Sequence, residues 1–378
     1  MKQKIMFVYL NLGGGHYSCA KSVANAIDKD FKNNVEISMV DGLQASPRLA
    51  KKVIEGFCGI YQNHAKWIYE GGYALNKLPF LSKSTSKSFS IMVKKYIKRK
   101  ISSENPDKII IFNSIIVAII EKALKELKSE IPTITVVTNP FTTPPKWFSG
   151  KNTHYIVFSD RLKKYAMKKK ISEDRLSIFN YISNEKFSKK LSEQEVLETK
   201  KRMNFSTKNK FVLILGGGVG IPKGEKILKL VADSTIDTDI ALVCGNDKQL
   251  KKKAEKIAKL YPYKNIQVHG FIDFVYELMG VSDLIITKGG PAIIMESLLL
   301  EKPLIVTNYL WEQEKGNVDF LVKNKAGFYQ PYLNRLPYLI QNLLEDENLK
   351  NNLIENIKSL NLKNGTPDVA KFIVDFSL

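Results

Sequence analysis

Cysteine is scarce in this chain, and the few cysteines have no spacing that suits a metal ion. Cys19, Cys58 and Cys244 are the only three in 378 residues, and they are odd in number and far apart. They therefore predict neither a zinc site nor a disulfide framework, and a reducing cytosol is the simpler interpretation.

Long hydrophobic runs are absent as well. The longest apolar stretch, residues 109–120, is interrupted by Asn113 and Ser114 and is too short to cross a bilayer. The first residues enter a predicted strand without the basic, apolar and small-residue order of a signal peptide, so we expect none. The 44% of hydrophobic residues excludes a disordered chain.

Acidic residues are under-represented in one half only. Residues 1–204 contain 36 lysines and arginines against 18 acidic residues, whereas residues 205–378 contain 22 against 20. The first half therefore holds a net charge of +18 out of the total of +20, which predicts that this half meets an anionic surface. Because the charge is chiefly lysine and no nucleic-acid-binding module is recognisable, we favour a membrane over a nucleic acid.

The basic excess is densest between Gly71 and Ser103, where eight lysines and arginines occur without an acidic residue. Apolar residues recur there at helical spacing. The basic side chains that lie mainly elsewhere on the helical wheel include Lys94, Lys95, Lys98 and Arg99. Such a helix, preceded by the apolar loop 78–81, suits docking on anionic lipid. The alternative is that the apolar stripe packs on the domain's own sheet and the lysines are simply solvated.

Short apolar strands alternate with amphipathic helical stretches in both halves, which is typical of parallel α/β sheets. The predicted strands are residues 4–9, 36–40, 108–112, 134–137, 155–158 and 176–179 in the first half, and 211–215, 240–244, 266–268, 284–287 and 304–307 in the second. The fold class is therefore α/β, with two doubly wound Rossmann-like domains facing each other across a cleft.

The length suits two domains of ordinary size. We place the first at residues 1–204 and the second at 205–360, with the polar segment 183–210 as the connection. We expect residues 361–378 to form a helix that packs back on the first domain.

Each half opens with a strand, a glycine cluster and a helix. The clusters are residues 13–15, followed by His16, and residues 216–220. Neither fits the phosphate-loop pattern, and the Rossmann fingerprint is not cleanly met. Glycine lets a substrate approach the backbone closely, and histidine is the side chain best matched to proton transfer near neutral pH. His16 is therefore a candidate catalytic residue, with a capping or packing role as the alternative.

The stretch 284–317 is predicted to form a buried strand, a Gly-Gly-Pro turn, a short helix, a second buried strand and a polar loop. Backbone N–H groups at the helix start suit a phosphate, and Pro291 fits the first helical turn. Glu296 suits the two hydroxyls of a ribose, and the loop residues Gln313, Glu314 and Asn317 suit the hydroxyls of a sugar. An ordinary β-α-β unit with a polar loop is the alternative.

Four ordered motifs resemble those of one family. They are Gly13-Gly14-Gly15-His16, then Thr138-Asn139-Pro140 leading to Trp147-Phe148, then Thr287-Lys288-Gly289-Gly290-Pro291 with Glu296, and finally Gln313-Glu314-Lys315-Gly316-Asn317. In this order, over almost the whole chain, they resemble the monogalactosyldiacylglycerol synthases and the bacterial processive diacylglycerol glucosyltransferases. These are GT-B enzymes of glycosyltransferase family 28, related to the lipid-linked N-acetylglucosaminyltransferase of peptidoglycan synthesis.

The resemblance implies an inverting glycosyltransferase of glycolipid biosynthesis that needs no cofactor and no catalytic metal ion. Such an enzyme moves galactose or glucose from a UDP-sugar to the 3-hydroxyl of 1,2-diacylglycerol, as a peripheral protein on the cytoplasmic face of a membrane. The Asp-x-Asp at residues 237–239 is accordingly expected to be a surface loop.

The resemblance also implies a role for each matched position. His16 would be the general base, with Asn139 as the second catalytic position and Trp147 on the acceptor side. The donor would be bound by Gly217, Gly218, Gly289 and Gly290 at the diphosphate, Phe271 at the uracil, Glu296 at the ribose, and Gln313, Glu314 and Asn317 at the hexose. Anionic lipids would meet Lys94, Lys95, Lys98 and Arg99.

Two positions depart from the family pattern, in which many members have Asp where this chain has Asn139 and His where it has Pro144. Asn139 could still form a hydrogen bond but would stabilise a protonated histidine less well. Three alternatives therefore stay open: a catalytically weak UDP-sugar sensor, a UDP-sugar 2-epimerase, and an N-acetylglucosaminyltransferase acting on an undecaprenyl-linked precursor. The last typically has a Gln-Gln pair where this chain has Gln313-Glu314.

Overall fold

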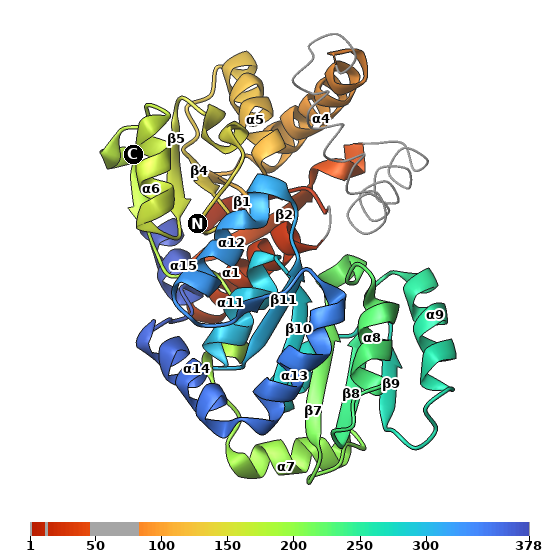
Figure 1. The fold of residues 1–378 in the computed structure, drawn as a ribbon. Coiled ribbons are helices and arrows are strands. Elements are labelled where there is room, and N and C mark those ends of the chain that lie inside the picture. Colours follow the sequence, from red (N-terminus) through yellow and green to blue (C-terminus); the bar gives the residue numbers. More distant parts are fainter. Residues whose placement is uncertain (1, 12–13, 46–82, 378) are drawn as a thin grey trace. The chain divides into compact units, whose positions relative to one another are not determined.

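The computed structural model describes residues 2–11, 14–45 and 83–377 (Figure 1). They form two compact α/β units: one ends at Glu185 and resumes at Asn364, and the other is Lys186–Lys363. The apolar loop 78–81, Gly13 and Cys58 lie outside the described residues.

The first unit is built on a six-stranded parallel sheet in the order β2-β1-β3-β4-β5-β6. Its strands are β1 (Gln3–Tyr9), β2 (Val35–Asp41), β3 (Lys108–Ile111), β4 (Thr133–Val136), β5 (Thr153–Val157) and β6 (Leu176–Ile178). All six strands predicted from the first half are confirmed. The strand order reverses beside β1, so the loop that follows β1 lies at the position where open α/β sheets bind ligands.

Helices accompany this sheet throughout the unit. They are α1 (Gly15–Phe31), α4 (Lys83–Glu104), α5 (Ser114–Leu127), α6 (Asp160–Lys168) and α15 (Thr366–Asp375), with the short 3-10 helices η1 (Gly42–Ala45), η2 (Pro145–Ser149) and η3 (Glu173–Arg175). Helix α15 packs against α1, and Lys108 Nζ donates to the carbonyl of Ile373, 3.0 Å away, at the end of α15. The C-terminal helix is thus part of the first unit.

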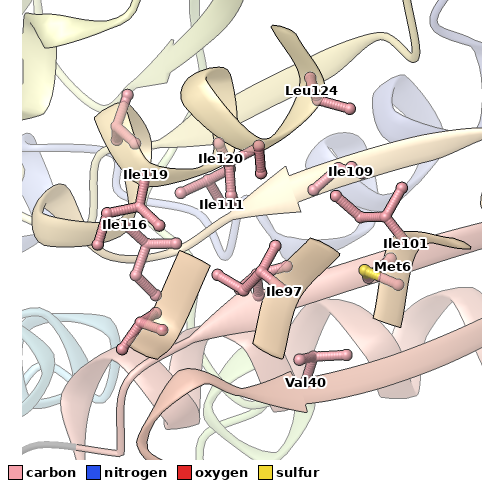
Figure 2. Packing of buried hydrophobic residues seen from close by; sticks show 14 of the residues in the cluster. Met6, Val40, Ile97, Ile101, Ile109, Ile111, Ile116, Ile119, Ile120 and Leu124 are labelled. Carbon is pink, nitrogen blue, oxygen red and sulfur yellow. The ribbon is translucent and has the colours of Figure 1, made fainter. Parts of the chain in front are cut away.

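A cluster of aliphatic side chains fills the space between the sheet and helices α4 and α5 (Figure 2). Met6 of β1 and Ile111 of β3 point into it, because alternate residues of a strand face the same side. Ile97 and Ile101 of α4 meet them from the helix side, and Ile97 is 0% exposed. Burying each such side chain contributes about 1.5–3 kcal/mol, so the apolar stripe of α4 is committed to this core.

The second unit is also built on a six-stranded parallel sheet, in the order β12-β11-β10-β7-β8-β9. Its strands are β7 (Lys210–Leu215), β8 (Thr238–Val243), β9 (Ile266–His269), β10 (Leu284–Lys288), β11 (Leu304–Asn308) and β12 (Phe328–Tyr329). The five predicted strands are confirmed. The two-residue β12 is too short for a periodicity to reveal it. The order reverses between β7 and β10, which sets the loops after these strands side by side.

Helices are interspersed with these strands along the chain. They are α7 (Glu193–Arg202), α8 (Gly224–Ala232), α9 (Lys248–Ala258), α10 (Val275–Val281), α11 (Pro291–Leu299), α12 (Trp311–Lys323), α13 (Leu336–Glu345) and α14 (Glu347–Ser359), with the 3-10 helices η4 (Glu185–Ser188), η5 (Gly217–Val219) and η6 (Leu333–Arg335).

Helix α7 occupies the polar segment that we expected to be a connection. Ser192 and Glu195 form a capping box at its start, and the helix packs against α10, where Arg202 lies 2.7 Å from Glu277. The units therefore divide after Glu185 rather than at 204. The helix was not apparent in the sequence because it buries only Thr199 and Lys200 and so has no apolar stripe.

The Asp-x-Asp at residues 237–239 is only partly the surface loop we expected. Asp237 is exposed, but Asp239 lies on β8 and is 1% exposed. Its carboxylate accepts hydrogen bonds from the N–H of Ser206 and from the side-chain amides of Asn209 and Asn265. Asp239 is therefore a structural residue that holds the neighbouring loops to the strand.

Candidate active site

His16 is the second residue of α1, a helix that begins immediately after the left-handed residue Gly14, whose φ is 85°. Only glycine adopts this conformation at little cost, so the turn places the imidazole at the carboxyl edge of the first sheet. The Nδ1 atom of His16 lies 2.8 Å from Oγ1 of Thr138, and its ring lies 5.8 Å from that of Trp147. Two of the predicted site residues, His16 and Trp147, are thus brought together.

Thr138, rather than Asn139, is the residue that contacts His16. Thr138 is 3% exposed, and its carbonyl accepts a hydrogen bond from the hydroxyl of Tyr181 at 3.2 Å. Asn139 is buried beside it, with 5% of its surface exposed. The sequence motif contained Thr138, but nothing in the spacing distinguished it from its neighbour. Because adjacent residues of an extended chain point in opposite directions, only one of the two can face the histidine.

The electrostatic state of His16 follows from its surroundings. Burial lowers the pKa of His16 from 6.5 to about 4. The imidazole is therefore neutral near pH 7, with one ring nitrogen able to accept a proton. A neutral threonine hydroxyl orients the ring, whereas a carboxylate would have favoured the protonated form.

Trp147 is buried rather than exposed at the surface. It lies on η2, is 2% exposed, and belongs to an apolar cluster with Val137 and Tyr155. Its indole instead forms a wall beside His16. The acceptor-side role implied for Trp147 stays a prediction, and the structure adds its packing next to the histidine.

The glycine cluster after β7 forms the short 3-10 helix η5, so it does not lead directly into a helix as we predicted. Gly217 has a φ of 75°, and a Cβ built on it would lie 3.8 Å from Ile293 of α11. Gly245, after β8, has a φ of 59°, and a Cβ there would lie 2.6 Å from the carbonyl oxygens of both Gly217 and Gly218. These close approaches need glycine, and they bring the loop after β7 next to helix α11.

The turn between β10 and α11 uses some of the N–H groups that we assigned to phosphate. Gly289 N–H donates to the carbonyl of Asn308 at 2.7 Å, and Gly290 N–H donates to that of Lys288 at 2.8 Å. The open donors of this turn are therefore those of Ala292 and Ile293, because N–H groups in a first helical turn have no carbonyl four residues earlier in the helix. Pro291, which has no N–H, occupies the first position as predicted.

The predicted polar loop at residues 313–317 is the beginning of helix α12. Glu314 is 6% exposed and accepts a hydrogen bond from the N–H of Leu310 at 2.7 Å, which caps this helix. Asn317 is 1% exposed and donates to the carbonyl of Gly289 at 2.8 Å, which fixes the neighbouring turn. A helical signal was present in the spacing of the buried residues Glu314, Asn317, Val318 and Leu321. We missed it because two of these four residues are polar.

The other residues that we predicted to bind the donor lie at the same edge of the second sheet. Glu296 is half-buried on α11, Gln313 is half-buried on α12, and Phe271, which follows β9, is 69% exposed. Gly270, which precedes Phe271, lies close to Gly245: a Cβ on Gly270 would be 3.7 Å from the Gly245 carbonyl oxygen. The loops after β7, β8, β9 and β10 therefore form one continuous rim.

The four basic residues of α4 that we predicted to face lipid divide into two pairs. Lys94 and Lys98 both form ion pairs with Glu126 of α5, the second at 2.8 Å, and these contacts hold the pKa of Glu126 at about 2. Lys95 and Arg99 are exposed. The core packing of Val93 and Ile97 matches the alternative in which the apolar stripe of this helix faces its own sheet. Only two of the four predicted lipid-facing cations are thus unpaired among the described residues.

Cysteines and acidic clusters offer no metal site in residues 2–11, 14–45 and 83–377. Cys19 and Cys244 are buried thiols, and burial raises the pKa of the Cys244 thiol to about 12. In the same part of the chain, none of the helices combines the length and the apolarity that a bilayer crossing needs.

Two family models match the chain in sequence order. The model for monogalactosyldiacylglycerol (MGDG) synthase matches residues 16–180, and that for the glycosyltransferase family 28 C-terminal domain matches residues 211–373. The first match begins at His16 and includes Thr138. The second includes the whole rim of the second sheet.

Individual relatives show the same relationship. Monogalactosyldiacylglycerol synthase 1 of Arabidopsis thaliana, a chloroplastic protein, is 24% identical over 335 residues, which are 86% of this chain and 62% of that protein. The chain thus spans less than two thirds of the length of the chloroplastic relatives that it first matches. The processive diacylglycerol beta-glucosyltransferase of Bacillus licheniformis is 25% identical over 382 residues, 99% of this chain and 95% of that protein.

A solved structure agrees on the fold. The crystal structure of a glycosyltransferase from Rickettsia africae superposes with a TM-score of 0.62 at 16% identity and covers 100% of both chains. The chain therefore belongs to the family of the monogalactosyldiacylglycerol synthases and bacterial diacylglycerol β-glucosyltransferases, and it has the GT-B fold.

Proposed function

We propose that this protein is an inverting glycosyltransferase that moves galactose or glucose from a UDP-sugar to the 3-hydroxyl of 1,2-diacylglycerol. The observation that supports this most directly is the neutral His16, held by Thr138 at a sheet edge within the segment matched by the MGDG synthase family model. A base that is unprotonated near neutral pH suits the deprotonation of an alcohol during attack.

The proposed reaction is a single displacement. The acceptor oxygen attacks the anomeric carbon while its proton moves to Nε2 of His16, and the bond between that carbon and the phosphate oxygen breaks. UDP departs with the bonding electron pair, and the configuration inverts to a β-linkage. For Nε2 to accept the proton, Nδ1 must carry the other hydrogen and donate it to Oγ1 of Thr138, 2.8 Å away.

The donor would lie along the rim of the second sheet. We assign the diphosphate to the first-turn N–H groups of Ala292 and Ile293, next to the Gly217–Gly218 loop, because a helix N-terminus favours an anion. Phe271 would meet the uracil and Glu296 the ribose hydroxyls. Gln313 would contact the hexose, while Glu314 and Asn317 hold the turn and helix that shape this end of the site.

We also propose that the protein works as a peripheral protein on the cytoplasmic face of a membrane with anionic lipids. The exposed Lys95 and Arg99 on α4 are the described residues of this helix that support the proposal. A nearby basic residue contributes about 1 kcal/mol to binding at an anionic surface. The pairing of Lys94 and Lys98 with Glu126 reduces their share.

A donor-by-acceptor screen tests this function. The purified protein is incubated with UDP-galactose, UDP-glucose or UDP-N-acetylglucosamine and with diacylglycerol, a sterol or an undecaprenyl lipid in anionic vesicles, and products are identified by mass spectrometry. We expect a β-hexosyl diacylglycerol, and we expect His16→Ala to reduce its formation by about 10²–10⁴-fold. Transfer only of N-acetylglucosamine to the undecaprenyl lipid would contradict the proposal. Binding of UDP-sugar without any transfer would favour the sensor.

A further inference from the structure

Lys288, the last residue of β10, is a buried lysine without a direct partner. It is 8% exposed, although lysines are almost never fully buried unless they are paired. Across the described part of the chain, no hydrogen bond or ion pair forms to its side-chain nitrogen. Burial lowers the pKa of Lys288, and the more distant carboxylate of Glu314 acts in the opposite direction. Two other buried or part-buried lysines of the same unit are satisfied. Lys200 donates to the carbonyl of Asn209, and Lys264 donates to that of Ser234.

The strand is irregular at this residue. The register between β10 and β11 shifts between Thr287 and Lys288, so that Lys288 pairs with Asn308. Irregularities of this kind redirect a side chain away from the regular alternation of the strand and are common next to active sites.

The surroundings of Lys288 place it at the turn that begins α11. Glu314, which acts on Lys288, also borders this turn: its Cβ would lie 3.4 Å from a Cβ on Gly289, and its Oε1 4.0 Å from one on Gly290. Gly290 is the residue that precedes the first turn of α11, and Gly217 approaches the same turn through Ile293. A buried lysine, a helix N-terminus and a glycine loop therefore meet at one place.

We propose that Lys288 binds the diphosphate of the sugar nucleotide at the first turn of α11. The inference rests on the proposed function and adds a donor-binding residue to which no role has been assigned above. The proposed role of Lys288 has a simple electrostatic reason. The Glu314 carboxylate beside the turn would repel a diphosphate, and a protonated Lys288 at the same turn would offset that repulsion. As the glycosidic bond breaks, negative charge grows on the phosphate oxygen, and the same ammonium stabilises it.

Binding of UDP and of uridine, measured by titration calorimetry, tests this assignment. Lys288→Met removes the charge and keeps much of the aliphatic length, whereas Lys288→Arg keeps the charge. Lys302→Met is the matched control. Burial lowers the pKa of Lys302 to about 8, but Lys302 stands just before β11 and therefore at the opposite edge of the sheet.

We expect Lys288→Met to weaken UDP binding by about 10- to 100-fold and to change uridine binding by less than about twofold, because only UDP has the diphosphate. Lys288→Arg should bind UDP within about fivefold of the wild type, and Lys302→Met should bind both ligands like the wild type. If Lys288→Met does not fold, the side-chain ¹⁵Nζ signal of Lys288 in the wild-type protein, assigned by its absence in Lys288→Arg, should shift on addition of UDP and not of uridine.

Wild-type UDP affinity in Lys288→Met would overturn the role of Lys288 and leave the proposed function standing. An equal loss of UDP and uridine binding in that variant would do so too, because it would indicate a structural role. An unmoved ¹⁵Nζ signal in the presence of bound UDP would do the same. A wild-type protein that does not bind UDP would overturn the proposed function together with this inference, so the two failures are distinguishable.

Discussion

The Nδ1 atom of His16 lies 2.8 Å from the hydroxyl oxygen of Thr138. This contact joins the start of α1 to the residues that follow β4, and it leaves Nε2 as the nitrogen available to a substrate. A hydroxyl can accept the Nδ1 hydrogen without adding charge, so the pair orients the ring while burial keeps it neutral. The contact with Thr138 thus orients the His16 ring, and desolvation keeps it neutral. Among the described residues, no carboxylate forms a hydrogen bond with His16.

Replacing Thr138 with valine should disturb this arrangement with little change in shape. We expect Thr138→Val to lower kcat by about 10- to 100-fold and to leave the KM for the UDP-sugar nearly unchanged, because orientation of the base matters only during proton transfer. Initial rates with saturating donor measure both constants. Thr143→Val is the matched control: the Thr143 hydroxyl is buried and makes no hydrogen bond with the described residues, so its loss should not reduce activity. Equal rates in Thr138→Val and wild type would contradict the role of this contact.

The low pKa of His16 predicts how activity depends on pH. The free enzyme should keep His16 neutral down to about pH 4, so kcat/KM should show no acid limb near 6.5 and should fall only as the pH approaches 4. A pH profile of kcat/KM checks this. An acid limb of kcat/KM centred at pH 6.5 that is absent only from His16→Gln would contradict this prediction.

The lowered pKa of His16 also predicts how the free energy of unfolding depends on pH. As the pH falls through 6.5 the unfolded chain takes up a proton on His16, whereas the native state does so only near 4. The free energy of unfolding should therefore decrease between pH 6.5 and 4 by up to about 3 kcal/mol, and it should not change above 6.5 on account of this residue. Urea titrations of the wild type and of His16→Gln isolate this contribution, because the variant should lack it.

Gly245 is the residue on which the packing of the glycine loop depends. Alanine there would have a φ of 59° and a Cβ 2.6 Å from two carbonyl oxygens, those of Gly217 and Gly218. We expect Gly245→Ala to lower stability by roughly 1–3 kcal/mol and to weaken UDP binding by about tenfold or more, because the loop must move. Thermal melting and UDP titration measure the two effects. Gly270→Ala, whose nearest contact would be 3.7 Å, should be close to wild type, and a similar loss in both variants would argue against a specific steric cause.

We expect Glu126 to weaken membrane binding. Glu126→Gln releases Lys94 and Lys98 from their ion pairs, so binding to phosphatidylglycerol vesicles should become tighter, by up to about 1 kcal/mol for each released lysine. Co-sedimentation at several salt concentrations measures the change. Glu130→Gln makes the same change in net charge at an exposed residue of the same region and should have a smaller effect. Neutralising Lys95 and Arg99 should weaken binding, and no response to these changes or to salt would exclude docking through α4.

Local sequence patterns were sufficient to predict the framework of this protein. Eleven strands, the glycine clusters, Pro291 at the first position of α11 and the family could all be read from local patterns, because hydrophobic alternation and glycine placement reflect the immediate needs of the backbone. The polar helices were harder: α7 and the start of α12 bury few apolar residues, so their periodicity was hidden.

Which polar groups contact one another depends instead on the packing of the folded chain. It selected Thr138 over Asn139 as the partner of His16, paired Lys94 and Lys98 with Glu126, and left Lys288 buried at the start of α11 without a direct partner among the described residues. Each of these relationships joins residues from different elements or depends on burial by them. Local spacing cannot predict such contacts, because the order of strands in the sheet, rather than the order of residues in the chain, brings the groups together.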